Sequence, residues 1–146
     1  MEDIKEFIDM RTIKFRGKNL DGEWVYGFYV EEERQTLNGF EKKYFIVNDG
    51  YDYVKPDTVG QITGLYDKDG KEIYEGDLIE VDGRLFGVVE WHKDGYFFIN
   101  DTIVGVRNDG GEYSPIGEMV RYFYNKGHDF SVIGNIHDNP ELLTNK

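Results

Sequence analysis

Asp-Gly turn signals recur along this chain of 146 residues and divide it into short segments. They stand at Leu20–Gly22, Asn48–Gly50, Lys68–Gly70, Val81–Gly83, Lys93–Gly95 and Asn108–Gly111. Between them lie runs rich in aromatic and β-branched residues, with 11 Tyr and 10 Phe in all, which suit pleated and half-buried strands. Many short strands separated by such turns are typical of a barrel or sandwich, so we expect a mainly β fold.

The first half of the chain predicts an antiparallel sheet. Thr12–Gly17 and Glu23–Glu31 alternate between polar and apolar residues and would form one hairpin. Lys43–Asn48 and Tyr51–Val54 would form a second hairpin. Glu31–Glu41 is polar and irregular, so we expect an exposed loop there. In Glu23–Glu31 the alternation gives one apolar face, which we expect in the core: Trp24, Tyr26, Phe28 and Val30.

The second half predicts a three-stranded meander. Its strands would be Leu78–Val81, Leu85–Trp91 and Tyr96–Asn100, joined by tight turns. Such a meander is the centre of a small SH3-like barrel, which we expect from about Glu75 to Asn100, with Val132–Ile136 closing the sheet.

One helix is expected between the meander and the closing strand, from Ser114 to Lys126. Ser114 would cap it, Pro115 suits its first position and Gly127 its end. Four apolar residues share one side at helical spacing: Ile116, Met119, Val120 and Phe123. A last turn is expected at Asn139–Leu143.

Composition excludes several classes of site. The chain has no cysteine, so disulfides, thiolate zinc sites and cysteine nucleophiles are excluded, and a reducing cytoplasm suits it. The net charge of −12 disfavours a nucleic-acid partner, since such binding depends on phosphate neutralisation. No apolar run reaches the roughly 20 residues that span a bilayer, and no signal peptide is expected.

The acidic and histidine residues do not form a recognised catalytic or metal motif. Asp67, Asp69 and Gly70 have the wrong spacing for a calcium loop and predict a β-turn. Glu90 and His92 could form an acid–base pair or an ordinary surface pair on one strand face. Because no nucleophile or phosphate-binding loop accompanies them, we expect no catalytic residue, no metal or cofactor site, and no enzymatic activity.

Aromatic side chains are the remaining candidates for a binding surface, because they can stack on bases or grip a peptide. The residues that we select for it are Trp91, His92, Tyr96 and Tyr44. Basic residues interleaved with aromatics would favour single-stranded nucleic acid, but only Lys14, Arg16 and Lys18 gather on one strand, which is thin support.

The order of several segments resembles the YopX-like family of phage and prophage proteins. The segments are RTIKFRGK (Arg11–Lys18), GEWVYGFYV (Gly22–Val30), PDTVGQITGLYDKDGKEIYEGDLIEV (Pro56–Val81), GVVEW (Gly87–Trp91) and VIGNIHDNPELL (Val132–Leu143). The resemblance implies a fold related to SH3-type barrels and an accessory role in a phage or prophage. It supplies no catalytic or binding residues.

These observations predict a β-rich α+β fold in which an SH3-like barrel packs with an N-terminal antiparallel sheet. Residues 10–146 would form one domain, with an N-terminal β lobe (10–64) and a barrel lobe (65–146). Residues 1–9 would be an extension, in which a short helix would place Ile4, Phe7 and Ile8 on one side. We expect a cytoplasmic, non-enzymatic module that binds a phage or host protein. The alternatives are self-assembly into a homo-oligomer and single-stranded nucleic-acid binding through an aromatic barrel face.

Overall fold

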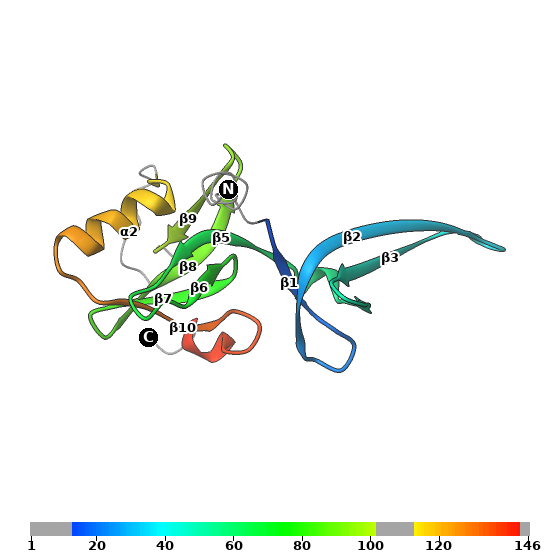
Figure 1. Ribbon diagram of the computed structural model, residues 1–146, viewed down its shortest axis with the longest axis horizontal. Coiled ribbons are helices and arrows are strands. Elements are labelled where there is room, and N and C mark those ends of the chain that lie inside the picture. Colours follow the sequence, from blue (N-terminus) through cyan, green and yellow to red (C-terminus); the bar gives the residue numbers. More distant parts are fainter. Residues whose placement is uncertain (1–12, 102–112, 144–146) are drawn as a thin grey trace, which may run out of the picture. The chain divides into compact units, whose positions relative to one another are not determined.

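The structure is a computed structural model that describes residues 13–101 and 113–143 (Figure 1). The chain divides into two compact units, the first ending at Gly64 and the second beginning at Leu65. The helix expected within residues 1–9 lies outside the described residues.

The first unit is built on an antiparallel sheet. Its elements are β1 (Phe15–Lys18), β2 (Trp24–Thr36), β3 (Gly39–Val47), β4 (Tyr51–Tyr53), the 3₁₀ turn η1 (Pro56–Thr58) and β5 (Gly60–Tyr66). The strand order is β4-β3-β2-β1-β5-β6, and the chain passes into the second unit within β5. Both hairpins expected from the alternation, β1–β2 and β3–β4, are present.

Strand β2 changes partners at Gly27. Trp24–Gly27 pairs with β1, whereas Phe28–Thr36 pairs with β3. A Cβ atom at Gly27, whose φ is +158°, would collide with the carbonyl oxygen of Val47, so only glycine allows this close approach. Beyond Gly27, β2 and β3 form a long antiparallel ribbon (Figure 1), which β4 joins at Phe45 to Val47 and which has two strands from the Glu31↔Tyr44 pair to its tip.

The prediction of an exposed loop at Glu31–Glu41 is right about exposure but wrong about secondary structure. These residues form the outer half of the β2–β3 ribbon, paired residue by residue from Glu31↔Tyr44 to Thr36↔Gly39. The local signal is Asn38–Gly39, a dipeptide that favours tight hairpin turns. The polarity of the segment reflects a ribbon with water on both faces rather than a lack of structure.

The second unit contains a four-stranded antiparallel sheet with the order β10-β7-β8-β9. Its elements are β6 (Glu72–Tyr74), β7 (Asp77–Val81), β8 (Arg84–His92), β9 (Tyr96–Asn100), α2 (Ile116–Asn125), β10 (Phe130–Asn135) and the 3₁₀ turn η3 (Pro140–Leu143). The meander β7-β8-β9 is the one expected, and β10 extends the sheet beside β7.

The core of the second unit lies between this sheet and α2, which covers it in Figure 1. The buried cluster consists of Ile73, Ile79, Val89, Ile99, Ile116, Phe123 and Phe130. Phe123 of the helix meets Phe86 edge to face at 5.4 Å and lies 5.7 Å from Phe130. Burying one such side chain contributes about 1.5–3 kcal/mol, so the helix is held mainly by packing.

Helix α2 confirms the expected segment but not its expected cap. The residue at the cap position is Pro115, which makes no side-chain cap hydrogen bond, so the prediction that Ser114 caps the helix is wrong. The C-terminal prediction is confirmed, because Gly127 follows the helix with a φ of +74° and the amide of His128 donates to the carbonyl of Phe123.

The expected fold class is confirmed, since the chain is mainly β, with two antiparallel sheets and one α-helix among the described residues. Within the same residues, no helix combines the length and apolar character that crossing a membrane requires.

We expect Gly87→Ala to destabilise the second unit by roughly 1–3 kcal/mol, the usual cost of overpacking. A Cβ atom there would lie 2.5 Å from the backbone carbonyl oxygen of Asn100, and backbone cannot move aside cheaply. Urea unfolding followed by fluorescence would measure the loss. A Trp24→Phe background leaves Trp91 of the second unit as the reporter, since the chain has 2 Trp.

The matched control is Gly117→Ala, on helix α2, where an added Cβ atom meets nothing within 4 Å. Alanine favours helices over glycine by up to about 1 kcal/mol, so this variant should be equally or more stable. Equal stability of the Gly87→Ala variant and the parent protein would contradict the close approach of β8 to β9.

A second prediction concerns acid stability at the β7–β8 turn. The amide of Asp129, and then the His128 side chain at 2.6 Å, lower the pKa of Asp82. Because its folded-state pKa is depressed, Asp82 stabilises the fold above its unfolded pKa of about 3.9, and this is lost as the pH falls through the folded pKa.

Asp82→Asn should therefore flatten the dependence of the urea midpoint on pH in that acid range. Asparagine also tolerates the positive φ of +51° at this position. Asp69→Asn, an exposed change on another turn of the same unit, is the control and should retain the parent slope. If Asp82→Asn kept that slope too, the contacts at Asp82 would not affect acid stability.

Candidate functional site

One face of the first sheet exposes a group of apolar and aromatic side chains. Cross-strand pairing puts Phe28 beside Val47 and Val30 beside Phe45, and β4 adds Tyr51 and Tyr53 next to these. We call this set the aromatic face: Phe28, Val30, Phe45, Val47, Tyr51 and Tyr53. Phe28 is 65% exposed and Tyr51 is 69% exposed, although both are large rings.

The prediction that Trp24, Tyr26, Phe28 and Val30 form the core is therefore wrong for its last three members. Tyr26, Phe28 and Val30 are all exposed, and Trp24 is only half-buried. The opposite face of the sheet is the covered one, where Ile46 is fully buried and Phe15 lies 5.9 Å from Tyr29. Alternation identifies which residues share a face, but not which of the two faces is covered.

A buried ring forms the floor of the aromatic face. Phe45 is only 4% exposed because the rings of Tyr51 and Tyr53 lie against it, at 5.7 Å and 4.8 Å between centroids. The ammonium group of Lys43 lies 5.6 Å from the Tyr53 ring. These ring contacts hold the exposed tyrosines in place, and rigid aromatics lose little side-chain entropy on binding.

Basic residues on β1 and directly before it also lie against aromatic rings of this unit. Arg16 lies 4.7 Å and Lys18 5.4 Å from the ring of Trp24, and Lys14 lies 6.0 Å from that of Tyr26. Such cation–π contacts contribute roughly 0.5–1 kcal/mol at exposed sites and more when desolvated. Arg16 and Lys18 of the expected basic group thus lie on β1, with Lys14 directly before it, and all three lie near rings of β2.

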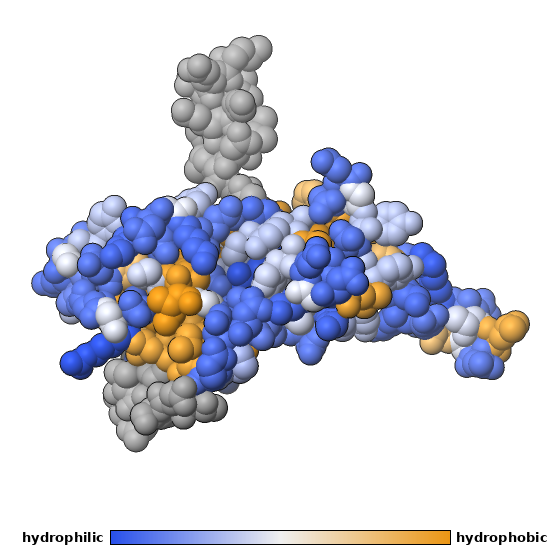
Figure 2. Space-filling view, turned by 90° about the horizontal axis from the view of Figure 1, so that it is seen from below, coloured by the Kyte–Doolittle hydropathy of each residue, from blue (hydrophilic) through white to orange (hydrophobic). Residues whose placement is uncertain are grey.

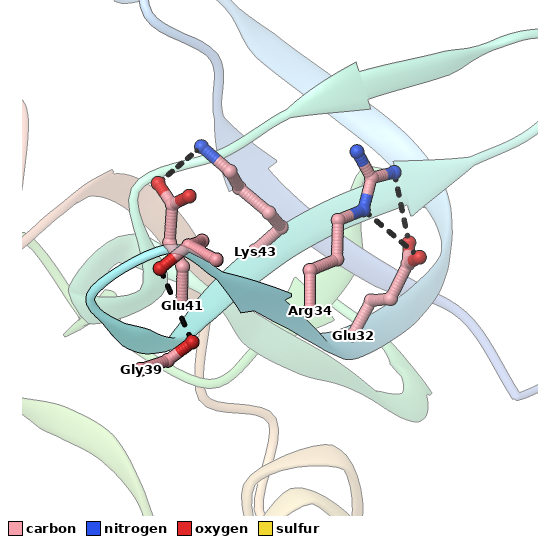
Figure 3. A network of polar contacts seen from close by, with 6 residues as sticks. Glu32, Arg34, Gly39, Glu41 and Lys43 are labelled. Atoms are coloured by element: carbon pink, nitrogen blue, oxygen red, sulfur yellow. Dashed lines mark hydrogen bonds and ion pairs between the residues drawn. The ribbon is translucent and has the colours of Figure 1, made fainter.

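The ribbon carries charges of both signs on the same face as the aromatic face (Figure 3). Arg34 donates to Glu32 at 3.0 Å and 3.3 Å, and Lys43 lies 2.7 Å from Glu41. The bond to Arg34 lowers the pKa of Glu32, and the contact with Glu41 raises the pKa of Lys43. Both shifts favour the charged forms of Glu32 and Lys43.

The tip of the ribbon is apolar. Leu37 is fully exposed and Phe40 largely so. Figure 2 shows this as a hydrophobic spot at the end of the ribbon, on an arm that is otherwise mainly hydrophilic.

Three of the four candidate binding residues lie at one end of the second sheet. His92 stacks on Tyr96, its partner across β8 and β9, with 4.5 Å between ring centroids and 9° between planes. Trp91 is half exposed and meets Phe97 at 4.8 Å on the other face of the same strands. The structure therefore brings His92 and Tyr96 together, while Trp91 points away from them.

The fourth candidate, Tyr44, belongs to the first unit and pairs with Glu31 on the face opposite to the aromatic face. The possible acid–base pair also has other contacts. Glu90 accepts a hydrogen bond from the side-chain amide of Asn100 at 3.1 Å, and Nδ1 of His92 accepts the amide of Asp94 at 3.0 Å. Both contacts are compatible with a surface role for these two residues.

The Asp67 turn is structural. One carboxylate oxygen accepts the amides of Asp69 and Lys71 at 2.9 Å and 2.8 Å, and the other accepts that of Val132 on β10 at 3.0 Å. These bonds confirm the β-turn. Among the described residues, no group of three or more His, Asp or Glu side chains is arranged to hold a metal ion.

Two signals in the sequence could have identified the aromatic face. The first is Asn38–Gly39, which predicts that β2 and β3 continue past Glu31. The second is that Glu32 and Arg34 continue the alternation of Trp24 to Val30, so they share its face. A strand face that carries unburied charges at one end is more often open to water than covered.

Comparisons with known proteins give a family and a fold. A family model described as "YopX protein" matches residues 3–144. The crystal structure of protein EF1440 from Enterococcus faecalis has a TM-score of 0.52 with this chain, covering 90% of this chain and 98% of that one. The two are 23% identical, so this likeness concerns the fold alone. No curated protein matches the chain.

We expect Asp67→Ala to destabilise the second unit by roughly 1–3 kcal/mol, because it leaves three backbone donors without their acceptor. Asp67→Asn retains one acceptor oxygen and should lose less. Thermal unfolding of both variants would measure the difference.

The same experiment tests the metal interpretation of this turn. Since the carboxylate already accepts three amides, calcium chloride should leave the melting temperature of the wild-type protein unchanged. A rise in that temperature which disappears in Asp67→Asn would instead indicate a calcium site.

Proposed function

The chain belongs to the YopX protein family, and we propose that it acts as a non-enzymatic protein-binding module through the aromatic face. The observation that carries this proposal is the exposure of Phe28 and Tyr51, at 65% and 69%, beside Val30 and Tyr53. Contiguous exposed apolar groups of this kind are found at protein interaction sites more often than on the rest of a protein surface.

The composition of the face favours a protein over other partners. Protein interfaces combine an apolar, aromatic centre with a polar rim. Here the rings form the centre, and charges of both signs adjoin them on the ribbon. The partner that fits is therefore a protein that contributes apolar side chains to the centre.

A nucleic acid fits less well. The net charge of −12 opposes the approach of any polyanion, and the charges on the ribbon beside the aromatic face are of both signs rather than uniformly positive. Enzymatic activity has less support still, because the contacts of Glu90 and His92 are those of ordinary surface residues.

The proposal also covers the biological setting of the protein. We extend the proposal to an accessory role in a phage or prophage, on the resemblance of the sequence segments. The absence of cysteine supports a reducing compartment, so we extend it also to the cytoplasm of a bacterial host.

The proposal predicts that Phe28→Ser combined with Tyr51→Ser abolishes capture of a protein partner. Each ring is worth about 1.5–3 kcal/mol when buried in an interface, so affinity should fall by roughly 100-fold or more. The measurement is affinity capture from bacterial and phage-infected lysates, followed by titration of each captured protein in purified form.

Two controls separate the aromatic face from other exposed apolar groups. Leu20→Ser changes an exposed residue on a turn of the same unit, and Tyr124→Ser changes one on helix α2. Both should bind like the wild type. If a purified partner bound the double variant as tightly as the wild type, the aromatic face would not be its docking site.

A further inference from the structure

Four charged side chains form a two-by-two checkerboard on the ribbon (Figure 3). Glu32 pairs across the ribbon with Lys43, and the next row on the same face pairs Arg34 with Glu41. Along each strand the sign also alternates, from Glu32 to Arg34 and from Glu41 to Lys43. We call these four residues the charge checkerboard.

A checkerboard of this kind is complementary to a copy of itself. If a second ribbon is placed face to face about a two-fold axis parallel to the strands, β2 of each copy lies over β3 of the other. Glu32 then lies over the second copy's Lys43, and Arg34 over the second copy's Glu41. Every charge therefore meets its opposite, as an isologous interface requires.

The β2 and β3 residues of the aromatic face match themselves under the same rotation. The row of Val30 and Phe45 lies beside the checkerboard row of Glu32 and Lys43, and the row of Phe28 and Val47 follows. Rotation about the same axis places Phe28 over the second copy's Val47, and Val30 over the row that holds the second copy's Phe45, whose ring is covered by Tyr51 and Tyr53. Apolar rows thus meet apolar rows while charged rows meet charged rows.

The ribbon also gains support in such a pairing. A two-stranded hairpin is only marginally stable in water, and within the described chain Phe28–Thr36 pairs with β3 alone. Two sheets packed face to face at about 30° would give each ribbon a second layer. The exposed charges would at the same time discourage pairing by strand edges.

We propose that the aromatic face and the charge checkerboard together form a self-association site. The partner that docks on the aromatic face is then a second copy of this chain. The proposal rests on the protein-binding function proposed above and names its partner. The apolar rows provide the affinity, and the checkerboard fixes the orientation and rejects shifted pairings. Another protein would need to reproduce both patterns in register, which a second copy does automatically.

The test is a charge swap followed by analytical ultracentrifugation at low ionic strength. The variant E32K/E41K makes the checkerboard wholly positive, and the variant R34E/K43E makes it wholly negative. Each should remain monomeric at concentrations where the wild type is dimeric, with a dissociation constant raised on the order of a hundredfold by like charges. An equimolar mixture should form a heterodimer, since every facing pair is then opposite in sign.

The matched control exchanges the charges of Glu33 and Lys42, which face each other on the other side of the same ribbon. E33K/K42E should dimerise like the wild type. Heterodimer formation also shows that both swapped variants are folded. A monomeric wild type at high micromolar concentration, or swapped variants that each dimerise alone, would overturn the proposal.

The outcome distinguishes this inference from the proposed function. If the wild type is monomeric but a purified partner protein loses binding to the Phe28→Ser and Tyr51→Ser variant, only self-association fails. If that double variant changes neither self-association nor partner binding, the protein-binding role of the aromatic face fails as well.

Discussion

The register between β2 and β3 is the constraint on which the candidate surface depends. Successive side chains of a strand point to opposite faces, so a slip of one residue between β2 and β3 would put the β2 members of the aromatic face and of the charge checkerboard on the opposite side from their β3 members. Gly27 lies where this pairing begins, because at this point β2 leaves β1 and passes close to the carbonyl of Val47. The close approach at the start of the ribbon thus requires a residue without a side chain.

Much of the fold follows from local signals in the sequence. The turns at Asp82–Gly83 and Lys93–Gly95 define the meander, and Gly127 ends the helix where helical spacing stops. Asp77 follows Gly76 in a tight corner, where its carboxylate accepts the amide of Tyr74 at 2.7 Å. These features depend on a few adjacent residues, which is why a single sequence is enough to predict them.

The candidate site depends on information that local patterns do not contain. The pattern from Trp24 to Val30 is that of an amphipathic strand, but burial depends on whether another layer covers the apolar side. The stack of His92 on Tyr96 follows from the turn between them, whereas Tyr44 was chosen by residue type alone and lies in the other unit. Residue type predicts what a side chain could bind, and only the pairing of strands shows its neighbours.

The two oxygens of Asp67 have a consequence for synthesis of the chain on the ribosome. One oxygen bonds the turn that follows β5, while the other bonds Val132, which is 65 positions later. The pairing of β7 is also incomplete until β10, its partner in the second sheet, has been synthesised. The pairings of β1 with β2, β2 with β3, β3 with β4 and β1 with β5 involve no residue beyond Gln61, so this unit can form during translation. The second unit closes only after nearly the whole chain has been released, and its unfinished sheet is the stage at which a nascent molecule is most exposed to misfolding.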